Sequence, residues 1–350
     1  MEKTGEGRES QASPGLMAIQ RIGCADSAPR LLLCAAALLS YPLHAAQSDA
    51  SGSYPSKPIR IVVPFAPGGN IDITARTVAP GLSEALGQPV VVENRGGAGS
   101  RIGTTLVAKS PPDGYTLLLG SSGSLAVQPA FHEDPGYHPR DFVYTSSISL
   151  TPIVLVTHPT VPARTLKAVI ALAKAQPGTL LMGSAGQGSN THLTGEYFQS
   201  IAKVKLLHVP YKGSGAAMVD LLGGQIHLMF DQVSTSGPHI RAGKLRAIAV
   251  TSQKRSTFLP DIPTADESGL RGFESSTTTT IAAPAATPKD VVAKLREAVL
   301  KVLDEPRTRQ AFEKLGAELV RSTPEDYARR LQDDLAKWTR VRKETGIKVE

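Results

Sequence analysis

The feature that most constrains the fold is a unit that repeats along the chain from residue 54 onward. Each unit has a short run of β-branched residues, a glycine-rich turn and a segment with helical periodicity. The first unit places a strand at 59–63, a turn at 64–69 and a helix from about 70 to 86, and the second places a strand at 90–93 and a turn at 94–99. Strands that alternate with helices in this order are typical of a parallel α/β sheet.

The same order restarts in the middle of the chain, which predicts a second α/β domain. After a strand at 153–156 come a helix at 166–175 and a strand at 180–182. Further strands are expected at 115–119, 206–209, 226–230 and 245–250. An uncharged stretch, 275–288, leads into a C-terminal helical region whose last helix follows Thr323. A length of 350 residues is enough for two such domains.

Residues 1–46 have the pattern of a leader for export. The apolar part of this segment, 31–41, is 11 residues long, well short of the ~20 that a membrane-spanning helix needs. Arg21 and Arg30 precede it and small residues follow it, as in a secretory signal peptide with its cleavage site. We therefore expect an exported protein whose mature chain begins near Gln47.

The cysteines support a fold that is held together by packing alone. Cys24 and Cys34 both lie in the predicted leader, whichever of Met1 and Met17 is the true start. An exported chain without cysteine uses no disulfide, no thiolate metal ligand and no cysteine nucleophile.

The net charge of +7 favours anionic partners or ligands over cationic ones. A nucleic acid is not expected among them. The basic run at 337–343 falls in the last turns of the final predicted helix, where cations complement the helix dipole. Aromatic residues make up only 5% of the chain and do not alternate with basic ones, as a base-stacking surface requires.

Common enzyme motifs are missing from the sequence. The glycines at 96–103 lack the G-x-G-x-x-G spacing, and neither G-x-x-x-x-G-K-[ST] nor G-x-S-x-G occurs. The segment 132–136 begins like a zinc-binding helix but lacks the second histidine. We therefore expect no catalytic residue, no metal and no cofactor.

Four glycine-rich turns each open onto a predicted helix, at 67–69, 96–99, 186–189 and 212–215. Such turns present backbone N–H groups at the positive end of a helix dipole, which suits a small anion. A single turn of this kind more often only reverses the chain. Four of them at the carboxyl ends of strands, two in each predicted domain, favour a ligand held from both sides.

Ordered motifs around these turns carry a resemblance to a known family. They read PFAPGGNIDITAR at 64–76, ENRGGAG at 93–99, GSAGQGSNTHL at 183–193, and VPYKG at 209–213 with DLLGG at 220–224. From about residue 54 to its C-terminus, the chain resembles the periplasmic receptors of tripartite tricarboxylate transporters, the Bug or TctC proteins.

The resemblance implies a type II periplasmic-binding-protein fold, in which two α/β domains enclose a ligand cleft. The first domain would then be discontinuous, at 54–152 plus 277–350, and the second would span 153–276. Such a receptor captures a small carboxylate or related organic ligand for the membrane subunits of a tripartite transporter or for a sensor kinase, and it acts as a monomer. An exported α/β enzyme acting on a small organic acid is the alternative.

The turns and the resemblance together predict the ligand site. In this family, backbone N–H groups, hydroxyls and bridging waters hold the ligand, and a β-carbon at Gly69 or Gly188 is expected to obstruct it. The predicted ligand-binding residues are Phe65, Ala66, Pro67, Gly68, Gly69, Asp72, Asn94, Ala98, Gly99, Ser121, Ser122, Ser184, Gly188, Ser189, Thr191, His192, Tyr211 and Asp231.

Some of these residues also have purely structural interpretations. Asp72 lies in the first turn of its helix, four residues before Arg76, and can serve as the partner of that arginine. Ser121 can simply form a turn. His192 can be a buried helix residue bonded to the backbone, and Asp231 can cap the segment that follows it.

Overall fold

The structure, a computed structural model, describes residues 54–349. The predicted leader and its cysteines lie outside these residues. The described residues belong to one compact unit, so the division into domains at 54–152 plus 277–350 and at 153–276 stays a prediction.

A ten-stranded sheet forms the framework, in the order β2-β1-β3-β9-β4-β7-β5-β6, with β8 and β10 also pairing with β4. Its strands are β1 (Ile59–Val63), β2 (Val90–Asn94), β3 (Thr116–Ser121), β4 (Phe142–Thr157), β5 (Leu181–Ser184), β6 (Leu207–Pro210), β7 (Leu228–Gln232), β8 (Arg246–Val250), β9 (Ser276–Pro284) and β10 (Glu318–Leu319). The β1 pairs with β2 and β3 are parallel, and so are the β5 pairs with β6 and β7. Strands β4 and β9 run antiparallel to their neighbours, so the sheet is mixed rather than all parallel.

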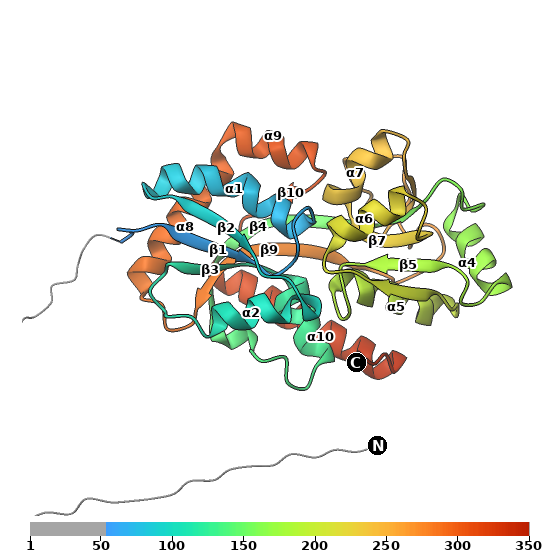
Figure 1. The fold of residues 1–350 in the computed structure, drawn as a ribbon, viewed down its shortest axis with the longest axis horizontal. Coiled ribbons are helices and arrows are strands. Elements are labelled where there is room, and N and C mark those ends of the chain that lie inside the picture. The colour runs from blue at the N-terminus through green and yellow to red at the C-terminus, as the bar shows by residue number, and fades with distance from the viewer. Residues whose placement is uncertain (1–53, 350) are drawn as a thin grey trace, which may run out of the picture. The chain divides into compact units, whose positions relative to one another are not determined.

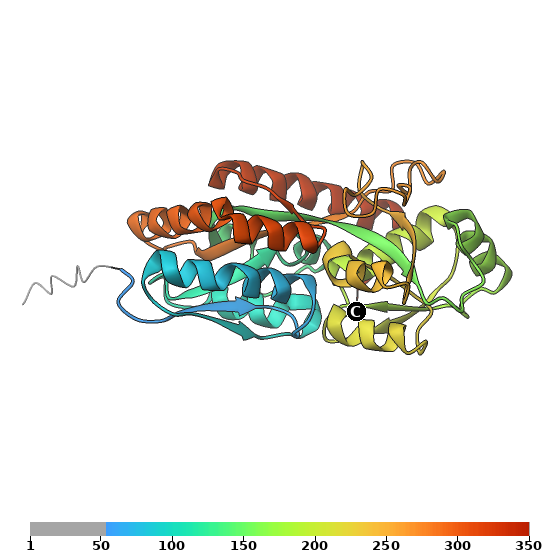
Figure 2. The same ribbon diagram turned by 90° about the horizontal axis from the view of Figure 1, so that it is seen from above.

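The long strand β4 joins two groups of strands (Figures 1 and 2). Its first part pairs with β9 and its last part with β7 and β8. We call β1, β2, β3 and the helices around them the β1 half, and β5 to β8 with their helices the β7 half. Each half has its own apolar clusters, with Ile61 and Leu119 in the first and Met182 and Phe230 in the second.

Ten α-helices cover the faces of the sheet over residues 54–349. They are α1 (Asn70–Leu86), α2 (Arg101–Ala108), α3 (Gln128–Phe131), α4 (Leu166–Ala175), α5 (Asn190–Ala202), α6 (Ser214–Leu222), α7 (Val233–Arg241), α8 (Lys289–Asp304), α9 (Pro306–Lys314) and α10 (Pro324–Thr345). Hydroxyl caps begin several of them: Thr165, Ser189 and Thr323 each accept a hydrogen bond from the backbone N–H three residues ahead.

The final helix, α10, joins the two halves. Tyr327 and Leu331 pack in the β1 half. Further along the helix, the Trp338 ring lies between Phe131 of α3 and Tyr197 of α5, with centroid distances of 6.1 and 6.0 Å. The apolar side chains of this helix therefore face both halves.

Candidate ligand-binding site

The four glycine-rich turns meet in pairs across the two halves. The first turn, 64–69, contacts the fourth, 212–215: the Ala66 N–H donates to the Lys212 carbonyl oxygen over 3.1 Å. The approach is close, because a β-carbon placed on Gly215 would lie 2.6 Å from the carbonyl oxygen of Pro67. Each turn precedes a helix, α1 and α6 respectively, so two helix N-termini point toward this contact.

The second turn, 94–99, contacts the third, 186–189, in the same way. A β-carbon on Gly99 would lie 2.2 Å from the carbonyl oxygen of Gln187 and 2.1 Å from the side-chain nitrogen of Gln128. Gly99 also has a φ of +62°, so both its space and its backbone require glycine. The second turn leads into a short 3₁₀ segment, Ala98–Ser100, before α2 begins.

Asp72 holds the first turn in place. Its carboxylate accepts hydrogen bonds from the Gly68 N–H at 2.9 Å, from Arg76 Nε at 3.0 Å and from Asn94 Nδ2 at 2.9 Å. Burial alone would raise the pKa of Asp72, but these three donors hold it below its usual value. Asp72 therefore has the structural role that its spacing to Arg76 indicated, while its contact with a ligand stays a prediction.

Two stacked histidines support the third turn. The Gly188 N–H donates to Nδ1 of His192 at 3.0 Å, and the His192 ring stacks on His208 with 3.8 Å between centroids. Nε2 of His208 lies 2.6 Å from the Ser184 hydroxyl, which in turn accepts from the Gly186 N–H. Burial, and then the adjacent His192, lower the pKa of His208 to about 3, so this ring stays neutral near pH 7.

The remaining hydroxyls of the predicted site accept hydrogen bonds from backbone N–H groups. Ser189 caps α5, and Thr191 accepts a hydrogen bond from the Ala185 N–H at 2.9 Å. At the end of β3, Ser121 bonds within its own turn, and Ser122 accepts from the Thr278 N–H on β9 at 3.2 Å. These hydrogen bonds order the walls of the site, and contact of the four hydroxyls with a ligand stays a prediction.

Several buried polar atoms have no hydrogen-bond partner among the described residues, including Asn70 Nδ2, Asn190 Oδ1, both Asp231 oxygens and Thr235 Oγ1. Asn70 and Asn190 are the first residues of α1 and α5, directly after the first and third turns. A buried polar group without a partner costs about 1–3 kcal/mol. A polar ligand bound between the turns would supply the partners.

The two asparagines also make long-range hydrogen bonds. Asn70 Oδ1 accepts from the Ser234 hydroxyl of the β7 half at 2.6 Å, and Asn190 Nδ2 donates to the Ser276 carbonyl oxygen on β9 at 3.1 Å. Neither asparagine is among the residues predicted from the sequence to bind the ligand. The available signal was that an asparagine follows a glycine-rich turn in both halves.

A cavity of about 110 Å³ lies where the turns meet. Its lining includes the predicted residues Phe65, Ala98, Gly99 and Tyr211, as well as Gly186. Tyr211 donates its hydroxyl hydrogen to Asp220 at 2.6 Å, so this phenol is already bonded on α6. The cavity is small because the turns are in contact.

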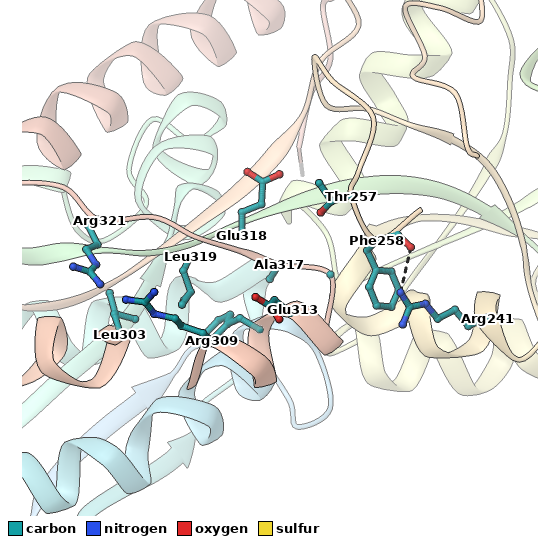
Figure 3. A pocket seen from close by; sticks show the side chains of 12 residues that line it. Arg241, Thr257, Phe258, Leu303, Arg309, Glu313, Ala317, Glu318, Leu319 and Arg321 are labelled. Atoms are coloured by element: carbon teal, nitrogen blue, oxygen red, sulfur yellow. Dashed lines mark hydrogen bonds between the residues drawn. The ribbon is translucent and has the colours of Figure 1, made fainter. Parts of the chain in front are cut away.

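A larger cavity, of about 580 Å³, lies between α7 and the α9–β10 segment (Figure 3). Its guanidinium groups are already engaged: Arg241 lies 3.4 Å from the centre of the Phe258 ring, and Arg309 and Arg321 both bind Asp304. None of the predicted ligand-binding residues lines it. We therefore place the ligand site at the turns.

Over residues 54–349, no group of three histidine, cysteine, aspartate or glutamate side chains is arranged to hold a metal ion. In the same range, none of the helices combines the length and the apolar character that crossing a membrane requires.

The family model of the tripartite tricarboxylate transporter family receptor, TctC, matches residues 74–347. The chain belongs to this family. It is 40% identical over 300 residues to the protein BugT of Bordetella pertussis, an alignment that covers 85% of this chain and 92% of BugT. The resemblance drawn from the four turn motifs is thus confirmed.

Solved structures of the family have the same fold. MatC of Rhodopseudomonas palustris, solved with bound malate, aligns with a TM-score of 0.80 and 32% identity over 82% of this chain and 99% of its own. A second protein of that organism, solved with adipate, aligns with a TM-score of 0.81 and 35% identity over 84% of this chain and 99% of its own. The type II periplasmic-binding-protein fold is confirmed, and the chain is a solute-binding receptor rather than an enzyme.

Proposed function

We propose that this receptor binds a small organic acid between its four glycine-rich turns and closes over it. The meeting of the turns in pairs carries the proposal, because it brings helix N-termini and unpartnered buried polar atoms from both halves to one place. Oriented N–H groups at helix N-termini favour an anion without a charged clamp. The malate and adipate bound to the two R. palustris relatives are acids of this kind.

The residues proposed to contact the ligand are those predicted from the sequence, with Asn70 and Asn190 added. Asn70 and Asn190 each offer a side-chain amide atom without a partner at the start of a helix. In this proposal the parts at 54–152 plus 277–350 and at 153–276 move as two domains, with β4 and β9 as the crossing strands. The ligand favours the closed form because it contacts both.

The proposal also includes the cellular setting. The mature receptor is periplasmic, is released from a cleaved leader, acts as a monomer and delivers its ligand to the membrane subunits of a tripartite transporter or to a sensor kinase. Amino-terminal sequencing of periplasmic material should return a chain that starts near Ala46 or Gln47. An intact chain that still begins at Met1 or Met17 would contradict export by cleavage.

A thermal-shift screen of the chain from Gln47 tests the ligand class. The panel holds dicarboxylates, tricarboxylates, aromatic acids and amino acids. A ligand at a hundred times its Kd stabilises the folded state by about 2.7 kcal/mol, which raises Tm by several degrees. Mass spectrometry of the denatured complex should then recover the acid unmodified. Turnover of the acid, or no stabilisation by any panel member, would contradict the proposal.

A further inference from the structure

Asp231 lies at the end of β7 that faces the turns. Strands β5 and β7 run parallel, with Gly183 beside Met229. Asp231 is therefore two positions further along β7, where β5 has ended at Ser184 and the chain enters the third turn. On its other side Asp231 pairs with Val154 of β4.

The side chain of Asp231 shares a face of β7 with Met229, because side chains alternate along a strand. Met229 and Met218 of α6 belong to the same apolar cluster, so Asp231 lies on the face of β7 that α6 covers. The first residue of α6 is Ser214, whose Cβ lies 3.6 Å from a β-carbon placed on Gly69. Asp231 thus lies beneath the contact between the first and fourth turns.

The Asp231 side chain is fully buried, and neither carboxylate oxygen has a hydrogen-bond partner among residues 54–349. Burial raises the pKa of Asp231 to about 7, although the Ser214 hydroxyl and the Gln232 N–H act in the opposite direction. Burying a carboxylate without a partner is costly, and bringing an anionic ligand beside it adds repulsion.

The charged groups on the elements around Asp231 are engaged elsewhere or lie far along their helices. Asp72 of α1 is paired with Arg76, and Asp220 of α6 accepts from Tyr211. His239 and Arg241 lie in the last turn of α7, whereas β7 leads into the first turn of that helix. A ligand bound at the turns can therefore supply a partner for Asp231.

We propose that Asp231 determines the specificity of this site, by selecting carboxylates that carry a hydroxyl or ammonium donor over the corresponding plain acids. The inference rests on the proposed function, since it names the class of acid that the same site takes. The ligand's carboxylate binds the turns, and its hydroxyl or ammonium hydrogen bonds to Asp231. A plain acid leaves Asp231 unpaired beside a second negative charge.

Calorimetry at pH 8 with three matched sets of acids tests this inference. The sets are succinate, malate and aspartate; glutarate, 2-hydroxyglutarate and glutamate; and phenylacetate, mandelate and phenylglycine. Within at least one set, the wild-type chain should bind a substituted acid at least tenfold more tightly than the plain acid. In the Asp231→Asn variant this preference should fall at least tenfold, with binding of the plain acid unchanged or tighter.

Asp261→Asn is the matched control, because it removes one carboxylate from an exposed position of the β7 half. Its preference for substituted over plain acids should equal that of the wild type. That result would exclude the change in net charge as the cause of the effect in Asp231→Asn. Without ligand, Asp231→Asn should be at least as stable as the wild type at pH 8, because it removes a buried charge; a merely structural aspartate would leave the variant less stable. If the Asp231→Asn variant fails to fold, the wild type alone tests the inference. Its preference for substituted over plain acids should weaken below pH 7, because Asp231 becomes protonated.

Equal binding of plain and substituted acids would overturn the inference and leave the receptor function intact. A preference that persists unchanged in Asp231→Asn would overturn it as well, and so would the failure of every substituted acid to bind. The proposed function itself is contradicted only if no acid of the thermal-shift panel binds.

Discussion

The backbone N–H of Ala66 donates a 3.1 Å hydrogen bond to the carbonyl oxygen of Lys212, across the two halves of the receptor. Ala66 lies in the first glycine-rich turn and Lys212 begins the fourth. No strand or helix connects the two turns directly, so this bond depends on how the halves meet. The contact of Gly99 with Gln187 depends on the same arrangement.

Gly99→Ala should block closure and weaken ligand binding. The new methyl group would overlap Gln128 and Gln187, and overpacking of this kind costs about 1–3 kcal/mol, or roughly 5- to 150-fold in affinity. Gly87→Ala is the matched control, with a similar φ of +67° but no described atom within 4 Å of the new methyl group. Titration calorimetry should show a loss of affinity for Gly99→Ala alone. Equal losses in both variants would mean that backbone strain, and not closure, matters.

Asp72→Asn should destabilise the first turn by about 1–3 kcal/mol at pH 7, because a buried, charged acceptor of three donors is replaced. Urea unfolding measures the difference. Because the folded-state pKa of Asp72 is lowered, its stabilising effect is present above pH 4 and is lost as the pH falls through the folded-state pKa. The difference in unfolding free energy between the variant and the wild type should therefore decrease at acidic pH.

Asp290→Asn serves as the control for this change, because Asp290 is an exposed acid in the first turn of α8. It should alter stability by less than about 0.5 kcal/mol. A similar loss in both variants would show that helix-dipole charge, rather than the bonds to the first turn, accounts for the effect of Asp72.

His208→Gln should make the receptor less sensitive to acid. The folded-state pKa of His208 is about 3, below its usual 6.5, so the unfolded chain binds the extra proton between those values. The contribution of His208 to the stability of the wild type is fully present above pH 6.5 and is lost as the pH falls toward 3. The Tm of the wild type minus that of His208→Gln should therefore decrease from pH 8 to pH 5. A difference that is constant over this range would contradict the neutral, buried state of His208.

Local patterns predicted most of the fold. The helix expected at 70–86 is α1, and the strands expected at 59–63 and 90–93 are β1 and β2. The strand expected at 226–230 begins two residues later, at Leu228, and Ile226 packs in the core ahead of the strand. The short strand β10 was not predicted, since it has two residues and depends on pairing with β4.

Long-range contacts account for what the sequence analysis missed in the site. The turns were found, but their pairing depends on how the halves meet. His208 was missed because its role depends on stacking with His192 from another element. Of the two glycines at which a β-carbon is expected to obstruct the ligand, Gly188 has a positive φ of +72°, whereas Gly69 has a φ of −91° and the positive value in the first turn, +85°, belongs to Gly68.

The distance between two spin labels, one in each half, measures directly whether the receptor closes over a carboxylate. A chain that starts at Gln47 has no cysteine, so Ile102→Cys on α2 and Val219→Cys on α6 label one exposed position in each half. Pulsed electron paramagnetic resonance should show a longer or broader distribution without ligand. Adding an acid that raises Tm should give one short distance, and Gly99→Ala should prevent that change. An acid that raises Tm while leaving the distances unchanged would contradict the account.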